Sequence, residues 1–389
     1  MPWKIKVPML TLRKEFVQLA DRKDRNMSRL CRRFGISRKT GYKWLRRWQA
    51  EGEAGLQDRS RRPKHSPNQT SRQVVRLVLE LQATYSEWGA RKLRMAMLRK
   101  CQEGQLPINP EQVPAASTIL AILKRNNRWQ PHVYGPSKDR ATQRFEREAP
   151  NQLWQLDFKG EFLLLNQRWC YPMTLLDDHS RFNLSLRACS NYQTKTVQAA
   201  LTATFRRYGL PEAILTDNGS PWGSSIRDSQ NNPYHTKLEA WLIRLGVRVI
   251  HSRPGHPQTH GKNERFNGTL QAELLRFEEF RNFPHAQQRF DWWRDRYNTE
   301  RPHQGIDDQV PIDRYSESWR TFPEQLPPIE YDQSDEIRKV NNNGYISYQA
   351  TSYKIGKAFC GHPVALRDQQ NPTRKTVYFC HQPIKEIHL

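Results

Sequence analysis

Three acidic residues in this chain of 389 residues lie in three different local contexts, and these contexts restrict what the chain can fold into. Asp157 belongs to the alternating run 154–158, Trp-Gln-Leu-Asp-Phe, which is typical of a strand. Asp217 comes directly after the apolar run 213–216, and Glu264 lies near the start of a predicted helix. Carboxylates on a strand, at a strand end and on a later helix can converge on one point where helices pack against a sheet.

Such a group of acids suits a metal site. Carboxylates are hard oxygen ligands, and two or three of them fit one or two Mg²⁺ ions that keep water or phosphate oxygens as other ligands. A single acid is most often a solvated surface charge or a turn residue, but the three contexts together favour a catalytic site at Asp157, Asp217 and Glu264. Asp177 and Asp178 compete with them, yet they stand beside Ser and His at a strand end and are interpreted as turn residues.

Longer motifs surround these acids and resemble those of a known family. The core motifs of DDE transposases and retroviral integrases are similar to Trp154-Gln-Leu-Asp157, Leu215-Thr-Asp-Asn-Gly-Ser220 and His256-Pro-Gln-Thr-His-Gly-Lys-Asn-Glu-Arg-Phe-Asn-Gly-Thr-Leu270. Bacterial transposases of the insertion-sequence-481 type, relatives of the insertion-sequence-3 group, resemble Gly55-Leu-Gln-Asp-Arg-Ser-Arg-Arg-Pro63 and Asn298-Thr-Glu-Arg-Pro-His-Gln-Gly305. The resemblance spans most of the chain, from near residue 10 to near residue 320.

The resemblance implies a ribonuclease-H-like core with Asp157 and Asp217 on adjacent central strands and Glu264 on a helix facing them. It implies cleavage and strand transfer of DNA by in-line phosphoryl transfer, with two Mg²⁺ ions for which Mn²⁺ can substitute. Asp157 would bridge both ions, and Asp217 and Glu264 would each hold one. Lys262 and Arg265 flank Glu264 and could contact phosphates, or they could be solvated charges at a helix start.

One departure from the family concerns spacing. Asp217 and Glu264 are separated by 46 residues, more than in retroviral integrases. The excess is expected in 221–234, a stretch rich in Gly, Ser, Asn and Pro that predicts a surface loop.

Positive charge is concentrated in the first 150 residues. They carry 33 Lys and Arg against 13 Asp and Glu, and so hold +20 of the formal charge of +24. Residues 151–330 carry 22 against 21. This distribution indicates DNA-binding modules joined to an enzymatic core. A ribosomal protein, or charge that only keeps the chain in solution, would leave the three acids unexplained.

Residues 1–54 are predicted to form a helix-turn-helix domain. Asn26 is a suitable N-cap for one helix, and Ser37 is a suitable N-cap for the next. In that second helix the apolar positions Gly41, Trp44 and Leu45 are predicted to face the core. The side chains left for base edges and phosphates, or else solvated, are Arg38, Lys39, Tyr42, Lys43 and Arg46.

Two basic linkers are predicted, over 55–67 and 131–150. The first contains arginines that suit a narrow minor groove or phosphates, namely Arg59, Arg61 and Arg62. Between the linkers, 68–130 is predicted to be a second helical, helix-turn-helix-like DNA-binding domain, with Ser117 capping its third helix. Lys124 and Arg125 follow as candidate DNA contacts, although a packing role for this domain is nearly as well supported.

The core is predicted over 151–330, with antiparallel hairpins first and parallel strands after them. The predicted strands are 153–158, 161–165, 171–176, 182–187, 213–216 and 247–250, and the predicted helices are 194–208, 235–245 and 263–277. Short strand-like runs over 335–389, including 345–353, predict a small β-barrel similar to the SH3-like tail domains of integrases. The fold class is therefore multidomain: all-α units first, an α/β core, then a β-barrel.

The six cysteines show no zinc-finger or CxxC spacing, which favours a reducing compartment. No secretory signal or membrane span is predicted. We therefore expect a cytoplasmic bacterial protein that is associated with the nucleoid when it is bound to DNA. His251, His256 and His260 complete no zinc pattern and are interpreted as loop residues.

These features predict a DNA transposase that binds the terminal inverted repeats of an insertion sequence and integrates them into target DNA. Its partner is double-stranded DNA, on which it works as a homodimer or a larger assembly. One alternative is a non-catalytic DNA-binding regulator derived from a transposase, which the intact acidic triad argues against. The other is a ribonuclease-H-type nuclease acting on hybrids, which would not need two DNA-binding units.

Overall fold

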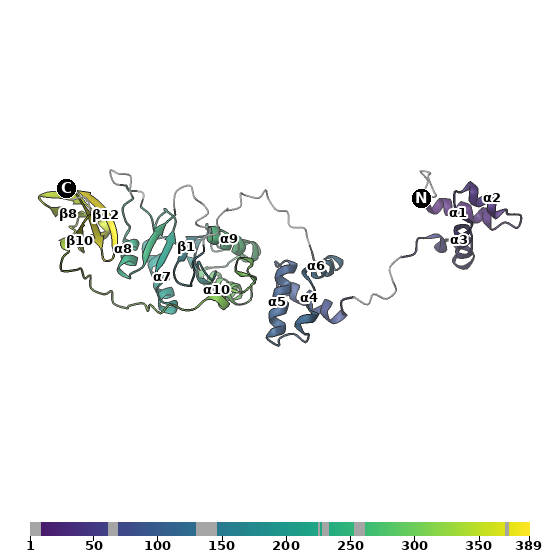
Figure 1. The fold of residues 1–389 in the computed structure, drawn as a ribbon, viewed down its shortest axis with the longest axis horizontal. Helices are drawn as coiled ribbons and strands as arrows, with labels where there is room; N and C mark the ends of the chain where they lie inside the picture. Colours follow the sequence, from purple (N-terminus) through teal and green to yellow (C-terminus); the bar gives the residue numbers. More distant parts are fainter. Residues whose placement is uncertain are drawn as a thin grey trace. The chain divides into compact units, whose positions relative to one another are not determined.

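The computed structural model describes residues 9–60, 69–129, 146–224, 226–227, 233–252, 261–369 and 373–389 (Figure 1). The chain divides into two compact units, Met1–Gln69 and Thr70–Leu389. Within the described residues, no helix has the length and apolar character needed to cross a membrane.

The first unit is helical. It contains α1 (Met9–Ala20), α2 (Met27–Arg33), α3 (Arg38–Glu51) and a short 3-10 turn, Gly52–Leu56. Both predicted caps are confirmed, because the side chains of Asn26 and Ser37 accept hydrogen bonds from the first turns of α2 and α3. Leu56 is fully buried in the core of this unit, since an apolar side chain gains free energy there. The packed domain therefore continues past residue 54, its predicted end.

A second helical domain opens the second unit. It contains α4 (Arg72–Thr84), α5 (Ala90–Gln102), a 3-10 turn (Pro110–Gln112) and α6 (Ala116–Arg125). Their apolar faces form one core around Val78, Leu93 and Ile119. The prediction that Ser117 caps α6 is wrong. The carbonyl of Ala115 already accepts from the backbone of Thr118 and Ile119, so the helix begins two residues earlier.

A mixed sheet forms the centre of the catalytic core. Its strands are β1 (Trp154–Phe158), β2 (Phe162–Leu163), β3 (Trp169–Asp177), β4 (Asn183–Cys189), β5 (Ala213–Thr216) and β6 (Arg248–His251). The order is β2-β3-β1-β5-β6, and β4 also pairs with β3. β3 runs antiparallel to β1 and β4, whereas β1, β5 and β6 are parallel. The predicted ribonuclease-H-like order is confirmed.

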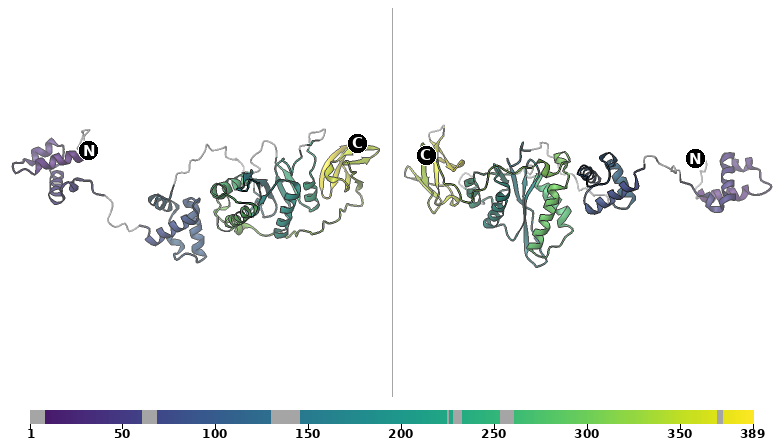
Figure 2. Two further views of the ribbon diagram at one scale, coloured as in Figure 1. Left: turned by 180° about the vertical axis from the view of Figure 1, so that it is seen from behind. Right: turned by 90° about the horizontal axis from the view of Figure 1, so that it is seen from below.

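Helices cover both faces of this sheet (Figure 2). α7 (Thr194–Tyr208) and α8 (Lys237–Arg244) share one apolar core with Trp154 and Leu156 of β1. α9 (Gly261–Leu270), a π-helical turn (Gln271–Leu275) and α10 (Phe283–Thr299) share another with Leu176 and Leu186. Two 3-10 turns follow, Gln304–Ile306 and Pro311–Arg314. The helix predicted over 263–277 is thus replaced by α9 and a π-helical turn, and α10 was not predicted.

The start of the core and its tail differ from the prediction. Residues 146–150, predicted as linker, pack on the core, because the backbone of Arg147 donates to the buried carboxylate of Asp178. The tail contains β7 (Glu336–Lys339), β8 (Tyr345–Tyr348), β9 (Thr351–Lys354), a 3-10 turn (Lys357–Phe359), β10 (Pro363–Asp368), β11 (Arg374–Phe379) and β12 (Gln382–His388). The run 345–353 is a hairpin and not one strand, because Gln349 and Ala350 adopt the left-handed conformation of a tight turn.

The tail forms two separate sheets. One is antiparallel with the order β12-β11-β10-β7, and the other is the β8-β9 pair, so the described strands do not close into a barrel. The tail is joined to the core by apolar packing, in which Ala240 and Ile243 of α8 are buried with Phe359 and Val364.

Candidate active site

Asp157 and Asp217 lie at the same level of two neighbouring strands. β1 and β5 run parallel, with Gln155 opposite Leu215, and each aspartate comes two residues later: Asp157 within β1, and Asp217 directly after the end of β5. Because side chains alternate along a strand, Asp157 points to the face opposite Trp154 and Leu156, which is the face covered by α9. The sheet register alone therefore brings the first two acids together.

Glu264 lies in the first turn of α9 and is exposed. The buried side-chain amides of Asn263 and Asn267 hold this helix against the sheet. Asn267 donates from Nδ2 to Oδ2 of Asp157 at 2.9 Å, and Thr174 of β3 donates to Oδ1 of Asn263 at 3.3 Å. A direct hydrogen bond thus ties the helix that carries the third acid to the first acid.

The charges of the other two acids act on Asp157. Burial and, next, the charges of Asp217 and Glu264 together raise the pKa of Asp157 to about 6, against the hydrogen bonds from Phe158 and Asn267. Nevertheless, no three His, Cys, Asp or Glu side chains in the described ranges stand close enough to enclose a metal ion. The arrangement is an open, acidic site in which like charges are near each other.

Asp217 is held by a tight loop that follows β5. Its Oδ1 accepts from the backbone N–H of Gly219 at 2.9 Å and from Nε1 of Trp222 at 2.5 Å. Trp222 is buried and stacks on Phe158, the neighbour of Asp157, with ring centroids 5.1 Å apart. This residue falls within the predicted surface loop 221–234, so that interpretation is wrong for Trp222. In the sequence, a bulky aromatic residue between Gly219 and Gly223 could have indicated that this part of the loop is buried.

Glu239 and His251 form a second set of hydrogen bonds that supports the end of β5. His251 ends β6 and is not a loop residue, which corrects the prediction. Its Nε2 lies 2.8 Å from Oε1 of the buried Glu239, and its Nδ1 lies 3.1 Å from the carbonyl oxygen of Asp217. Burial would lower the pKa of His251, but these two oxygens raise it instead. Burial would raise the pKa of Glu239, but hydrogen bonds from His235 and His251 hold it at about 2. His256 and His260 lie outside the described residues.

The remaining acids of the sheet are structural. Asp177 ends β3 and Asp178 begins a turn, as predicted, but both are fully buried. Asp177 accepts from the backbone N–H groups of Asn151 and Ser180, whereas Asp178 pairs with Lys262 at 2.6 Å. Lys262 therefore neutralises a buried carboxylate, which revises its role as a phosphate contact. Burial lowers its pKa to about 8.

Known protein families match most of the chain. Models described as integrase core domains match residues 147–257 and 245–311, and the model of the IS481 family transposase C-terminal domain matches residues 335–389. Helix-turn-helix and homeodomain-like models match residues 12–64 and 40–115. These matches show helix-turn-helix domains, an integrase core domain and a C-terminal domain of the IS481 transposase type.

Individual relatives resemble parts of this chain, which spans about half the length of the first of them. It is 28% identical over 163 residues to an uncharacterised 31.7 kDa protein of insertion element IS407 from Burkholderia multivorans, a match that covers 42% of this chain and about half (54%) of that protein. It is 26% identical over 255 residues to the transposase of IS904 from Lactococcus lactis, covering 63% and 96%. The HTLV-2 integrase catalytic core domain in complex with magnesium aligns at 17% identity with a TM-score of 0.33, covering 43% and 99%.

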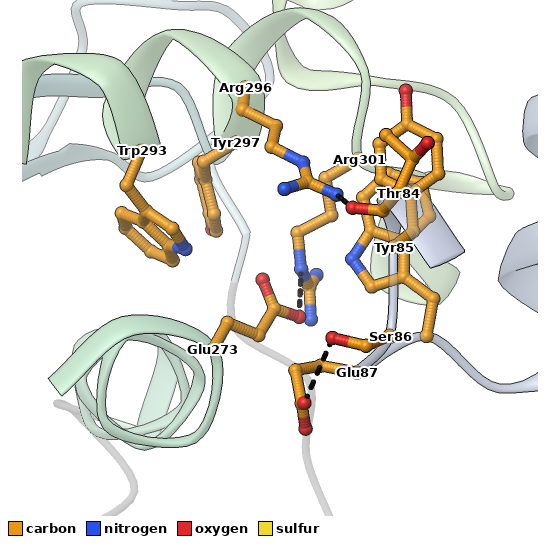
Figure 3. A pocket seen from close by; sticks show the side chains of 10 residues that line it. Thr84, Tyr85, Ser86, Glu87, Glu273, Trp293, Arg296, Tyr297 and Arg301 are labelled. Atoms are coloured by element: carbon orange, nitrogen blue, oxygen red, sulfur yellow. Dashed lines mark hydrogen bonds and ion pairs between the residues drawn. The ribbon is translucent and has the colours of Figure 1, made fainter. Parts of the chain in front are cut away.

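The second helical domain contacts the core through a group of residues that we call the clasp: Tyr85, Lys92, Glu273, Arg296 and Arg301. Glu273 lies on the π-helical turn after α9 and pairs with Arg301 at 2.9 Å and with Lys92 of α5 at 3.5 Å. Arg296 lies 4.2 Å from the ring centroid of Tyr85. Figure 3 shows four of these side chains, Tyr85, Glu273, Arg296 and Arg301, around a small cavity that residues of both domains line.

Further contacts extend the clasp along the same interface. The Tyr85 hydroxyl donates to Glu300 at 2.7 Å. Ion pairs join Arg91 to Asp308 at 2.7 Å and Arg99 to Asp313 at 2.6 Å. The second helical domain is therefore packed on the α/β core, beside the helix that carries Glu264.

The residues predicted to contact DNA are distributed over both units. On α3, the five side chains Arg38, Lys39, Tyr42, Lys43 and Arg46 are all exposed. Arg59 pairs with Glu51 of the first unit, and Arg61 and Arg62 lie outside the described residues. At the end of α6, Arg125 is exposed, and Lys124 lies over the Trp129 ring. Arg265 is exposed next to Glu264.

Proposed function

We propose that this chain is a DNA transposase that binds the terminal inverted repeats of an insertion sequence and catalyses DNA cleavage and strand transfer. The observation that carries the proposal is the arrangement of Asp157 and Asp217 at one level of adjacent parallel strands, with the helix of Glu264 bonded to Asp157. Three carboxylates near one another at the edge of an open site suit phosphoryl transfer, where negative charge must be neutralised.

The donor set fits divalent metal ions. In the described part of the chain, hydrogen bonds reach Oδ1 but not Oδ2 of Asp217, which leaves Oδ2 for a metal, while the carboxyl of Asp157 accepts from Asn267 and from the backbone of Phe158. Nearby like charges favour a cation between them, and oxygen ligands suit Mg²⁺ or Mn²⁺. We propose two Mg²⁺ ions, with Asp157 shared and Asp217 and Glu264 each holding one. When bound, such ions supply charge neutralisation at the attacking and leaving oxygens.

The residues of the protein position the reacting groups for two successive steps. Water attacks the phosphodiester at the end of the element, so that a bond from phosphorus to the water oxygen forms while the bond to the 3′-oxygen breaks. The freed 3′-hydroxyl then attacks a phosphodiester of the target in the same way, and its proton passes to solvent. No covalent bond to the protein is required. Arg265 is exposed beside Glu264 and would contact the DNA backbone.

The helical domains would recognise the ends of the element. The exposed side chains of α3 would reach base edges in the major groove, and the ends of α3 and α6 would contact phosphates. Joining two ends to one target requires two active sites, so we propose a working form that is at least a dimer on DNA. The same proposal includes three further points. The tail has SH3-like character, it contacts DNA or a partner protomer, and the protein acts on the chromosome in the bacterial cytoplasm.

The proposal is tested by removing each carboxylate. Asp157→Asn, Asp217→Asn and Glu264→Gln should each abolish cleavage and strand transfer in Mg²⁺, because each amide weakens metal binding. Binding of a labelled element end should remain within about twofold, since affinity comes mainly from cationic side chains elsewhere. Glu161→Gln, which changes an exposed acid directly before β2, is the control and should retain activity. Strong strand transfer by Glu264→Gln would contradict the assignment.

The same assay separates the alternatives. A DNA-binding regulator would bind ends and show no metal-dependent cleavage even with all three acids intact. A hybrid-specific nuclease would cut an RNA–DNA duplex in preference to an element end. The paired carboxylates favour catalysis over the first, and the helix-turn-helix matches favour DNA over the second.

A further inference from the structure

The carboxylate of Asp217 is oriented by two N–H groups that approach the same oxygen. In the described residues, Oδ1 accepts both the backbone N–H of Gly219 and the indole N–H of Trp222, and no hydrogen bond reaches Oδ2. A carboxylate bonded in this way cannot rotate about its own axis without losing both hydrogen bonds. Oδ2 is thereby presented to one side.

The loop that carries Trp222 is built to return to Asp217. The N–H of Gly223 donates to the carbonyl of Gly219 at 2.6 Å, which closes a tight turn. A Cβ on Gly223 would lie 2.0 Å from the carbonyl oxygen of Asn218, and one on Gly219 would lie 3.3 Å from the Asp217 carboxylate. Position 223 has no room for a side chain, and at position 219 the Asp217 carboxylate would have to shift by a few tenths of an ångström, so Gly223 is the glycine that the turn requires.

The indole ring also connects the two aspartates. It is buried at 3% exposure and stacks on Phe158, which directly follows Asp157 on β1. One face of the ring is therefore fixed by the strand of the first acid, while its N–H fixes the second acid. Displacement of the ring would alter the position of Asp217 relative to Asp157.

We propose that Trp222 is a positioning residue for the proposed metal site: it fixes the rotation of the Asp217 carboxylate so that Oδ2 can hold a metal ion. This inference rests on the proposed function and adds a residue to it. Groups that orient metal ligands commonly contribute 10- to 100-fold to metal affinity or activity. A role confined to filling the core is the competing explanation, since Trp222 is also part of the apolar core.

Trp222→Phe separates these explanations, because phenylalanine keeps an aromatic ring on Phe158 and removes only the indole N–H. The affinity for Mn²⁺ is measured from the electron paramagnetic resonance of free Mn²⁺, with the full chain bound to a DNA end that lacks a 3′-hydroxyl and cannot react. Trp222→Phe should weaken Mn²⁺ binding about 10-fold or more. It should also raise the Mg²⁺ concentration that half-saturates strand transfer by a similar factor, while end binding is unchanged.

Trp241→Phe is the matched control. Trp241 is half-buried against the same apolar core, but its indole N–H does not contact an acid of the site in the described structure. It should leave Mn²⁺ affinity unchanged even if it lowers the melting temperature as much as Trp222→Phe does. Equal Mn²⁺ affinity for wild type and Trp222→Phe overturns the proposal, as does an equal loss in both variants.

Failure of the proposed function gives a different result. If the wild-type chain neither binds Mn²⁺ in the presence of DNA nor cuts element ends, the metal-dependent reaction itself is refuted. If the wild type does both, and Trp222→Phe does both equally well at every metal concentration, only the role of Trp222 is refuted.

Discussion

At the scale of single residues, hydrogen bonds fix the carboxylates of Asp157 and Asp217 close to each other although their like charges repel. Asn267 holds one oxygen of Asp157, and Gly219 and Trp222 hold one oxygen of Asp217. These bonds keep two carboxylates close in the absence of a cation, although their mutual repulsion opposes it. Residues placed for chemistry in this way reduce the stability of the folded chain.

Removing the charge of Asp157 should therefore stabilise the metal-free protein. Its pKa of about 6 lies above the ordinary 3.8, so the folded chain binds this proton more tightly than the unfolded chain. Wild-type stability should then fall as the pH rises from about 4 to about 6, and Asp157→Asn should remove this fall. After solvent screening, we expect the variant to gain about 1–2 kcal/mol at pH 7.5 relative to pH 4.5.

Urea unfolding at the two pH values, with a chelator present, measures this difference. Glu161→Gln, which removes an exposed acid directly before β2, is measured in parallel as the control. The same gain for Asp157→Asn at both pH values would mean that the carboxyl of Asp157 is not perturbed.

At the scale of elements, α3 depends on a close approach that only glycine permits. A Cβ on Gly41 would lie 2.6 Å from the Cys31 sulfur and 2.9 Å from the buried Phe16 ring. Alanine favours a helix over glycine by about 1 kcal/mol, but overpacking costs about 1–3 kcal/mol. Gly41→Ala should therefore lower the melting temperature of the first unit.

Gly268→Ala provides the opposite control. Gly268 is also a helical glycine, on α9, and nothing lies within 4 Å of its Cβ position. There the helix preference of alanine should act alone and stabilise the second unit by up to about 1 kcal/mol. Calorimetry of the full chain reports both transitions, and stabilisation by Gly41→Ala would show that the three-helix packing is looser than described.

Local signals in the sequence predicted local structure well. The helix over 194–208 and the strand over 213–216 are found as predicted, because their apolar periodicity and flanking residues are sufficient. α10 escaped prediction because its charged residues interrupt the apolar pattern, and its buried face depends on α9 and β4. The contact of Trp222 with Asp217 could not be predicted, since it arises from a loop that folds back. The positions of the three acids were anticipated from motifs, whereas their hydrogen-bond partners required the structure.

At the scale of the whole molecule, the clasp makes the second helical domain part of the catalytic unit. Glu273 and Arg301 are each about nine-tenths buried, with side-chain exposures of 10%. Loss of one partner from a buried ion pair typically costs about 3–5 kcal/mol, because the remaining charge is left without compensation. Glu273→Gln should therefore strongly lower the thermal stability of the second unit, and Lys92→Met should partly restore it by removing one excess cation.

Glu278→Gln is the control for this experiment. Glu278 follows the same π-helical turn and pairs with Arg289, but both side chains are more than a quarter exposed and lie outside the clasp. Such a pair contributes less, about 1 kcal/mol or below. If Glu273→Gln and Glu278→Gln had equal effects on the melting temperature, the clasp would not hold the domain to the core.

The clasp also bears on how such proteins can diverge. A chimaera that exchanges only residues 1–60 between two related transposases keeps Tyr85, Lys92 and their partners in Glu273 and Arg301 together. An exchange made between α6 and β1 separates them and leaves mismatched charges on both sides of the junction. If the first unit recognises element ends as proposed, residues before 70 can be exchanged alone to change that recognition. The second helical domain and the core have to be exchanged together, because the clasp joins them.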